Sequence, residues 1–128
     1  MLETGIQGRA EAVVCDTNTA AAVGSGSLAV FATPYMIALM EEAAQSSVAP
    51  YLAEGESTVG TKISVSHDAA TPLGMKVWAE SSLTEIDGRR LVFEVRAFDE
   101  CGPIGQGSHE RFIIRQLRFL EKVEAKKA

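Results

Sequence analysis

The spacing of apolar and polar residues divides the chain into several strands and one helix. Five segments alternate with the period of two that is typical of a strand with one buried face. They are residues 5–15, 60–68, 75–86, 89–100 and 106–120. The Asp-Gly pair at 87–88 is typical of the tight turn of a β-hairpin. Most of the chain is therefore predicted to form a sheet of strands joined by short turns.

One segment, residues 33–49, breaks this pattern and predicts a long helix. It reads TPYMIALMEEAAQSSVA, and apolar side chains occupy most of its circumference. Thr33-Pro34 suits a helix start, and Pro50 disfavours helix in the residue before it. The glycine- and serine-rich residues 16–27 predict a loop ahead of the helix.

The order of these elements predicts an α+β domain in which a curved antiparallel sheet cradles the helix. Strands joined by short turns are most simply antiparallel neighbours. The length of 128 residues, without an internal repeat, fits a single domain over residues 1–128. We expect the ends, residues 1–5 and 121–128, to be frayed. Because a second copy can cover the exposed edge of such a sheet, we also expect a homodimer, with pairing of dimers into a tetramer left open.

Composition narrows the classes of function. The net charge of -5 argues against general nucleic-acid binding, although a few arginines can still hold a small anionic ligand. Cys15 and Cys101 are isolated, so we expect free thiols in a reducing compartment rather than a disulfide framework or metal cluster. The N-terminus lacks a signal pattern, and no apolar stretch approaches the roughly 20 residues of a membrane span. We therefore expect a cytoplasmic protein.

Two adjacent carboxylates, Glu41 and Glu42, interrupt the apolar helix. Residues three and four positions apart share a helix face. Glu41 therefore lies with Ile37, Ala44 and Val48, whereas Glu42 lies on a more polar side. Glu41 is predicted to point toward the core or a pocket, where a carboxylate needs a partner. The alternative is an exposed Glu41 at the edge of the apolar stripe.

His67 is predicted on the strand face that meets the helix, together with Ile63 and Val65. A lone histidine there is usually a hydrogen-bonded core residue, but a facing Glu41 would make an acid/base pair. Thr33 can simply cap the helix, or it can help hold a polarised oxygen beside the helix N-terminus. Gly60 begins the His67 strand, where a missing side chain would let a ligand approach the backbone.

Two arginine-containing segments remain. In GSHER, residues 107–111, alternation places His109 and Arg111 on one strand face and Glu110 on the other. The plainest interpretation is a solvated strand end with surface ion pairs. The GRR segment, residues 88–90, predicts a hairpin with exposed arginines, or alternatively a contact with a nucleotide phosphate.

Several of these segments resemble the fluoroacetyl-CoA thioesterase family, a branch of the hot-dog-fold thioesterases. The resemblance is carried by ATPYMIALMEEA, APYLAEGESTVGTKISVSHDAATPLG, DGRRLVFEVRAFDE and IGQGSHERFII. It spans residues 31–114 without a gap and is most specific over residues 49–74. It implies a hot-dog fold working as a dimer, an acyl-CoA substrate that is cleaved to a carboxylate and free CoA, and no metal or redox cofactor.

The resemblance also assigns roles to single residues. It implies that Thr33, Glu41 and His67 are catalytic and that Gly60 and Arg111 contact the substrate. The stretch GSGSLAVF, before the helix, lacks the aromatic character of the family's acyl pocket, and Glu42 stands where an aromatic residue is familiar. We therefore predict a general short-chain acyl-CoA thioesterase rather than one selective for a fluorinated acyl group.

Two other functions fit part of the pattern. A hot-dog hydratase or dehydratase also pairs an acid with a histidine over an acyl-CoA, but it usually places both groups in one segment. Here Glu41 and His67 are far apart in the sequence, which disfavours that function. A non-catalytic acyl-CoA-binding module is the second alternative. The sequence does not separate general-base from covalent catalysis by Glu41.

Overall fold

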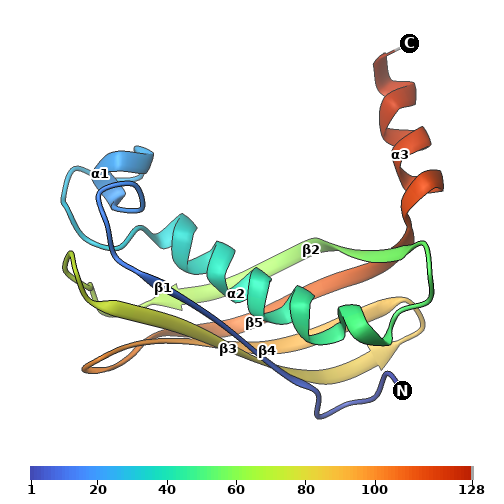
Figure 1. Cartoon of the computed structure of the whole chain (residues 1–128), viewed down its shortest axis with the longest axis horizontal. Coiled ribbons are helices and arrows are strands. Elements are labelled where there is room, and N and C mark those ends of the chain that lie inside the picture. Colours follow the sequence, from blue (N-terminus) through green and yellow to red (C-terminus); the bar gives the residue numbers. More distant parts are fainter. Residues whose placement is uncertain (128) are drawn as a thin grey trace.

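The computed structural model describes residues 1–127 and contains one antiparallel sheet with the strand order β1-β3-β4-β5-β2. The sheet curves around one long helix, α2, which lies across its concave face (Figure 1). This is the predicted α+β arrangement. The strands are β1 Gln7–Val13, β2 Glu56–His67, β3 Lys76–Asp87, β4 Arg90–Asp99 and β5 Gly102–Arg115.

Helix α2 spans Thr33–Val48, and a 3-10 turn, η1, continues it over Ala49–Tyr51. Ala32, not Thr33, is the N-cap residue, and it offers no side-chain hydrogen bond to the helix. Proline in the first turn suits this start because its fixed φ is already helical. The buried side of α2 consists of Met36, Leu39, Met40, Ala43, Ala44 and Val48.

The hairpin of β3 and β4 supplies most of the sheet's contribution to the core. Its turn contains Gly88 with a φ of 61°, a conformation that glycine adopts without strain. Alternate residues of β4 point inward, as predicted, and all of them are buried. They are Leu91, Phe93, Val95 and Ala97.

Strand β2 lies at one edge of the sheet and contains a β-bulge. Its pairing with β5 shifts between Gly60 and Lys62, so Thr61 has no partner of its own in the ladder. A bulge adds one residue to a strand and thereby reverses which alternate residues face the core. Gly60 lies opposite Arg111 and His67 opposite Gly105. Both Gly60 and His67 therefore face α2, although simple alternation would place them on opposite faces.

The C-terminal part of the chain differs from the prediction. Strand β5 ends at Arg115, and residues predicted as strand up to 120 form helix α3, Gln116–Glu124. A 3-10 turn, η2, follows at Ala125–Lys127, so residues 121–127 are helical rather than a frayed tail. Leu117 and Phe119 continue the period of two by chance, which extended the predicted strand. Helix α3 projects away from the sheet and leaves the body of the molecule (Figure 1).

The segment before α2 also differs, because a short helix, α1, occupies Ala20–Val23 within the predicted loop. Thr19 caps it, and its side chain accepts a hydrogen bond from the Ala22 amide at 3.2 Å. Within residues 1–127, Cys15 and Cys101 are exposed and form no disulfide. No helix in this range is long and apolar enough to cross a membrane.

The close contact between β1 and α2 depends on Gly8. A Cβ atom there would collide with the Ala43 carbonyl of α2 and lie 2.7 Å from the Ser47 Cβ atom. We expect Gly8→Val to lower the free energy of unfolding by about 1–3 kcal/mol, because α2 or β1 must move to admit the side chain. Urea unfolding would measure this change. Gln7→Val, at the exposed neighbouring position, is the control, and equal effects of both variants would contradict the explanation.

Candidate active site

The first part of the site joins the start of α2 to the end of β2. The Thr33 hydroxyl lies 2.7 Å from Nδ1 of His67, within hydrogen-bonding distance. The two residues are 34 positions apart in sequence, and the tight contact requires the fold. The Thr33 side chain therefore contacts the imidazole and does not cap the helix.

The other nitrogen of the His67 ring is unusual. His67 Nε2 is buried and has no hydrogen-bond partner within residues 1–127. Buried polar atoms without partners are rare in proteins, and they often mark places where a ligand or a reacting group binds. A cavity of about 240 Å³ lies against this pair. Its wall consists of Ala20, Ser25, Val30, Phe31, Thr33, His67, Asp68, Ala69 and Ala70.

The surroundings keep His67 neutral at pH 7. Burial lowers the pKa of the imidazole below its usual value, and the backbone of Ala69 and the charge of Asp68 oppose this only in part. A neutral imidazole has one nitrogen free to accept a proton. His67 can therefore act as a base, or as an acid once it has taken up a proton.

The second part of the site is built around a buried cation, Arg111. Its guanidinium donates to the Thr58 hydroxyl from Nε at 2.8 Å and to the Thr58 carbonyl at 3.0 Å. It also donates to His109 Nε2 at 3.1 Å and to Glu41 Oε2 at 3.4 Å. Arg111 is only 6% exposed, so this set of partners compensates for the water it has lost.

His109 holds the opposite side of this cluster, and its hydrogen bonds define its protonation state. Nδ1 lies 2.8 Å from the Lys62 carbonyl, which can only accept, so Nδ1 carries the proton. Nε2 accepts from Arg111, so the ring is neutral. Burial lowers the pKa of His109, and the charge of Arg111 lowers it further, against the Lys62 hydrogen bond.

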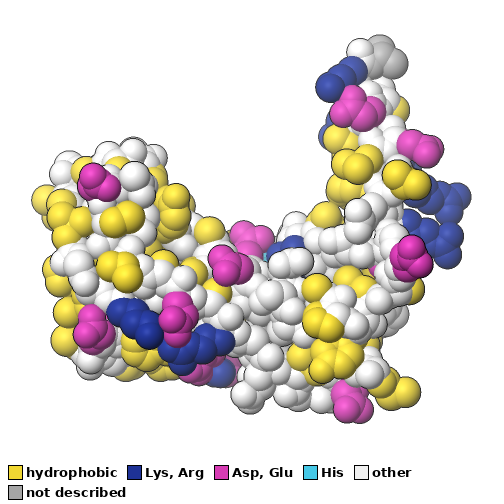
Figure 2. Space-filling view, viewed as in Figure 1, with side chains coloured by type: hydrophobic (Ala, Val, Ile, Leu, Met, Phe, Trp, Pro, Cys, Tyr) yellow, Lys and Arg dark blue, Asp and Glu magenta, His cyan; other side chains and the backbone are white. Residues whose placement is uncertain are grey.

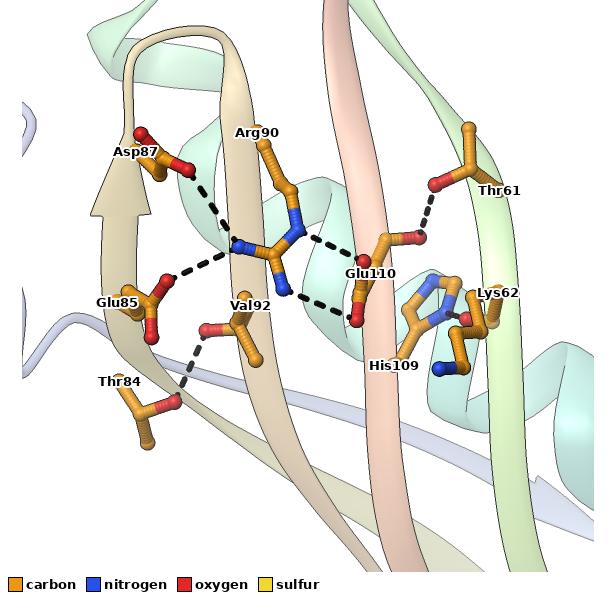
Figure 3. A network of polar contacts seen from close by, with 9 residues as sticks. All are labelled: Thr61, Lys62, Thr84, Glu85, Asp87, Arg90, Val92, His109 and Glu110. Atoms are coloured by element: carbon orange, nitrogen blue, oxygen red, sulfur yellow. Dashed lines mark hydrogen bonds and ion pairs between the residues drawn. The ribbon is translucent and has the colours of Figure 1, made fainter.

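Neighbouring residues on β5 point to opposite faces of the sheet. Figure 3 shows Glu110 paired with Arg90 on one face, while the His109 ring lies on the other side of the strand, toward Lys62. This confirms the predicted alternation of His109 and Glu110. The expectation of a solvated strand end was wrong, because His109 is 1% exposed and lies in the interior.

Glu41 reaches β2 because Gly60 has no side chain. A Cβ atom at Gly60 would lie 2.7 Å from Glu41 Oε2 and 3.2 Å from the His109 ring. Gly60 thus creates the space in which the carboxylate meets Arg111. The Glu41 side chain is 42% exposed, so one side of the carboxylate is held while the other remains open to solvent. Glu42 is exposed on the neighbouring side of the helix, as helical phase predicted.

The structure brings the five residues from the sequence analysis into two groups. Thr33 and His67 form one pair, and Glu41, Gly60 and Arg111 form the other group with His109 and Thr58. Thr33 and Glu41 are eight residues apart on α2, or about 12 Å along the helix axis. Within residues 1–127, no hydrogen bond or ion pair links Glu41 to His67.

The start of α2 offers less to an anionic ligand than an ordinary helix end. Pro34 has no amide hydrogen, and the amides of Tyr35 and Met36 both donate to the Ala32 carbonyl. The first turn can therefore present at most the Thr33 amide to a ligand. Among the residues that the structure describes, no group of three or more His, Cys, Asp or Glu side chains is arranged to hold a metal ion.

Comparison with known proteins defines the class and then the family. A family model described as fluoroacetyl-CoA-specific thioesterase matches residues 14–117. The fluoroacetyl-CoA thioesterase of Streptantibioticus cattleyicolor is 46% identical over 97 residues, which cover 76% of this chain and 70% of that protein. The solved structure of the fluoroacetyl-CoA thioesterase FlK superposes with a TM-score of 0.91 at 37% identity and covers 98% of both chains.

A hypothetical protein from Thermus thermophilus, a thioesterase superfamily member, superposes with a TM-score of 0.91 at 28% identity, over 99% of this chain and 94% of that one. The fold and these likenesses define a thioesterase of the hot-dog class. Within that class, the chain belongs to the fluoroacetyl-CoA-specific thioesterase family. The family membership favours thioester hydrolysis over the hydratase and the non-catalytic binding module.

Two members of the Arg111 cluster, Thr58 and His109, were not predicted from the amino-acid sequence. Thr58 holds the guanidinium through both its hydroxyl and its carbonyl. It was missed because the predicted strand began only at residue 60, whereas β2 begins at Glu56. His109 was considered only as a surface residue. The signal that could have identified it is the pairing of two potentially charged residues, His109 and Arg111, on an inward-facing strand side.

The histidine environments predict a measurable titration. The chain has two histidines, and NMR of their ring protons should show both with a pKa below the ordinary value of about 6.5. The unfolded chain then binds these protons more readily than the folded one. The free energy of unfolding should therefore fall as the pH drops below about 6.5. A His67 midpoint above 7 would contradict the assignment of burial as the dominant influence.

Proposed function

We propose that this thioesterase hydrolyses a short-chain acyl-CoA, with Thr33, Glu41 and His67 as catalytic residues and Gly60 and Arg111 as substrate-positioning residues. The observation that carries the proposal is the Thr33–His67 hydrogen bond of 2.7 Å beside a cavity, with His67 Nε2 buried and unpartnered. A reacting group that enters the cavity would meet the imidazole directly. Related solved structures include FlK variants with acetyl-CoA and with fluoroacetate and CoA, which makes acetyl-CoA a suitable probe.

The size of the cavity supports a short acyl group. Its volume is about 240 Å³, below the roughly 300–1,000 Å³ of typical ligand pockets. Small side chains, including Ala20, Ser25 and Ala69, form part of its wall together with Phe31. An acyl chain of a few carbons fits this volume.

Each proposed residue has a defined chemical task. Water adds to the thioester carbonyl carbon, and the carbon–sulfur bond then breaks to give a carboxylate and the CoA thiol. Glu41 either removes a proton from this water, or attacks the carbonyl carbon itself, in which case the carbon–sulfur bond breaks first and water then cleaves the resulting anhydride. In both cases Arg111 holds the carboxylate in place. His67, once it has taken up a proton, passes that proton to the departing sulfur. The Thr33 hydroxyl orients the imidazole and stabilises the developing negative charge on the carbonyl oxygen.

Both groups of residues must act on one carbonyl, which supports a homodimer. Within one chain the two groups are separated by about 12 Å along α2, too far for joint contact with a single thioester. Strand β2 is an edge strand, and its residues 60–64 are exposed. An uncovered edge of this length is a natural place for a second copy to pair.

Antiparallel pairing of β2 with the same strand of a second copy would bring the groups together. In a two-fold arrangement, residues opposite each other have position numbers with a constant sum. With the two-fold axis at Ser64, residue 63 of one copy would lie opposite residue 65 of the other, and residue 67 of one copy would lie opposite the bulge at Gly60 and Thr61 of the other. The carboxylate of one chain and the imidazole of the second would then face the same substrate.

Substitution of single residues tests the catalytic assignment. We expect Glu41→Gln and His67→Ala each to lower kcat for acetyl-CoA hydrolysis by at least about 100-fold, because each removes a group that moves a proton in the reaction. Free-thiol release gives the rate. Glu42→Gln, which alters the exposed neighbouring carboxylate, is the matched control and should hydrolyse acetyl-CoA like the parent. Parent-like rates in both test variants would refute the assignment.

Mixing the two inactive variants tests whether two chains share one site. Glu41→Gln and His67→Ala proteins would be unfolded together in urea and refolded as a mixture. Random pairing gives about half mixed dimers, each with one intact site, so about a quarter of the parent activity should return. Each variant refolded alone is the control. If the mixture stays as inactive as its components, the site lies within one chain.

A further inference from the structure

A groove at the base of α3 gathers positive charge that the proposed catalytic residues do not use. Its volume is about 380 Å³, and it is lined by Arg89, Ile113, Ile114, Arg115, Arg118, Phe119 and Lys122. Four of the twelve lysines and arginines of the chain thus line one groove of a protein whose net charge is -5. Figure 2 shows Lys and Arg side chains gathered on one side of the base of the projecting helix.

The spacing of these residues creates a cationic side on α3. Four groove residues share one face of the helix, because they are spaced by three, four and seven positions from the first of them. They are Arg115, Arg118, Phe119 and Lys122. Arg115, Arg118 and Lys122 are exposed, and within residues 1–127 none of them forms an ion pair. Their charges are therefore available to a ligand.

The two arginines of the hairpin differ in how far their charges are paired. The charge of Arg90 is balanced by acidic side chains, whereas the charge of Arg89 is only partly balanced and can also attract a ligand. Arg90 is held by Glu110 at 2.9 Å and by Glu85 at 3.0 Å, so its charge is balanced on the outer face of the sheet (Figure 3). Arg89 donates to the Ile113 carbonyl at 2.9 Å, which fixes it at the rim of the groove. Its only acidic partner among the described residues is Glu56, at 3.4 Å.

The groove also has features that suit a nucleotide rather than a simple anion. Ile113 and the half-buried Phe119 supply apolar surface on which a base can lie. The N-terminus of α3 opens beside it, and its N-cap residue, Arg115, makes no side-chain cap hydrogen bond. The positive end of the helix dipole adds to the attraction for phosphate.

The groove continues from the Arg111 cluster along the same strand. Arg111, Ile113 and Arg115 lie on one face of β5, and Arg115 is four residues, or about 13 Å, beyond Arg111. The pantetheine arm of CoA links a thioester to a nucleotide that carries a 5′-diphosphate and a 3′-phosphate, and its extended length is comparable. A thioester near Glu41 would therefore place its nucleotide within reach of the groove.

We propose that the groove between α3 and the hairpin arginine Arg89 binds the phosphate groups of the CoA nucleotide, with Arg115, Arg118 and Lys122 as the main contacts. This inference rests on the proposed function, because the ligand is the carrier part of the same substrate. Nucleotide binding would give a role to α3 and to its cationic face, which take no part in the proposed catalytic site. The binding energy from the groove serves recognition of the carrier, not the chemical step.

Charge reversal in the groove tests the proposal. We expect Arg118→Glu and, separately, Lys122→Glu to raise KM for acetyl-CoA by at least about tenfold while kcat changes less than twofold. Hydrolysis of S-acetyl-N-acetylcysteamine, which carries the same thioester without a nucleotide, should not change. Lys76→Glu makes the same charge change on β3, far along the chain from the groove, and should behave like the parent. Equal losses on both substrates, or no loss on acetyl-CoA, would overturn the proposal.

Direct binding separates this inference from the proposed function. Adenosine 3′,5′-bisphosphate, measured by calorimetry, should bind the parent and bind Arg118→Glu at least about tenfold more weakly, whether or not thioesters are hydrolysed. Acetyl-3′-dephospho-CoA then identifies the phosphate concerned. If Arg118→Glu no longer raises KM on this substrate, the groove holds the 3′-phosphate; if it still does, the groove holds the diphosphate. A changed sedimentation coefficient in Arg118→Glu would instead assign these cations to a contact between copies and would overturn the proposal.

Discussion

The arrangement of the site depends on the burial of one cation, Arg111. A guanidinium taken out of water must be surrounded by acceptors, because an unpaired buried charge is strongly destabilising. Thr58 on β2, His109 on β5 and Glu41 on α2 all supply contacts, so three elements are tied to one side chain. The direction of the Glu41 carboxylate is therefore a consequence of this requirement. The neutral state of His109 follows too, since its Nε2 must accept from the cation.

The two groups of site residues differ in how they are held. Glu41 is fixed by a charged partner and by the space at Gly60, whereas His67 has only Thr33 on one nitrogen and nothing on the other within residues 1–127. The Glu41 carboxylate is thus preorganised, whereas His67 keeps one ring nitrogen, Nε2, without a hydrogen-bond partner among the described residues. This difference suits the proposed mechanism, in which the carboxylate keeps a constant orientation while the histidine changes protonation.

The elements with a regular hydrophobic period were predicted correctly from the sequence. The prediction failed where one pattern fits both a strand and a helix, and where a contact between distant residues determines the structure. Helix α2 and the hairpin of β3 and β4 were predictable because Pro34, Pro50 and the Asp-Gly turn mark their ends. Helix α3 was missed because Leu117 and Phe119 also fit a strand. The inward position of Glu41 relative to Glu42 followed from helical phase. The contact of Thr33 with His67 could not be derived from spacing, because it joins residues that only the folded sheet brings together.

The bulge at Thr61 has a consequence for how this strand tolerates change in length. On its N-terminal side, even-numbered residues such as Thr58 and Gly60 face α2; on its C-terminal side, odd-numbered residues such as Val65 and His67 do. Deleting the single residue Thr61 would restore regular pleating and turn one half of the strand over. Either Gly60 or His67 would then leave the concave face, although no residue with a chemical role had been removed. In β2, the number of residues between these two proposed site positions is therefore as strictly constrained as their identity, whereas the loops at its ends are free of that condition.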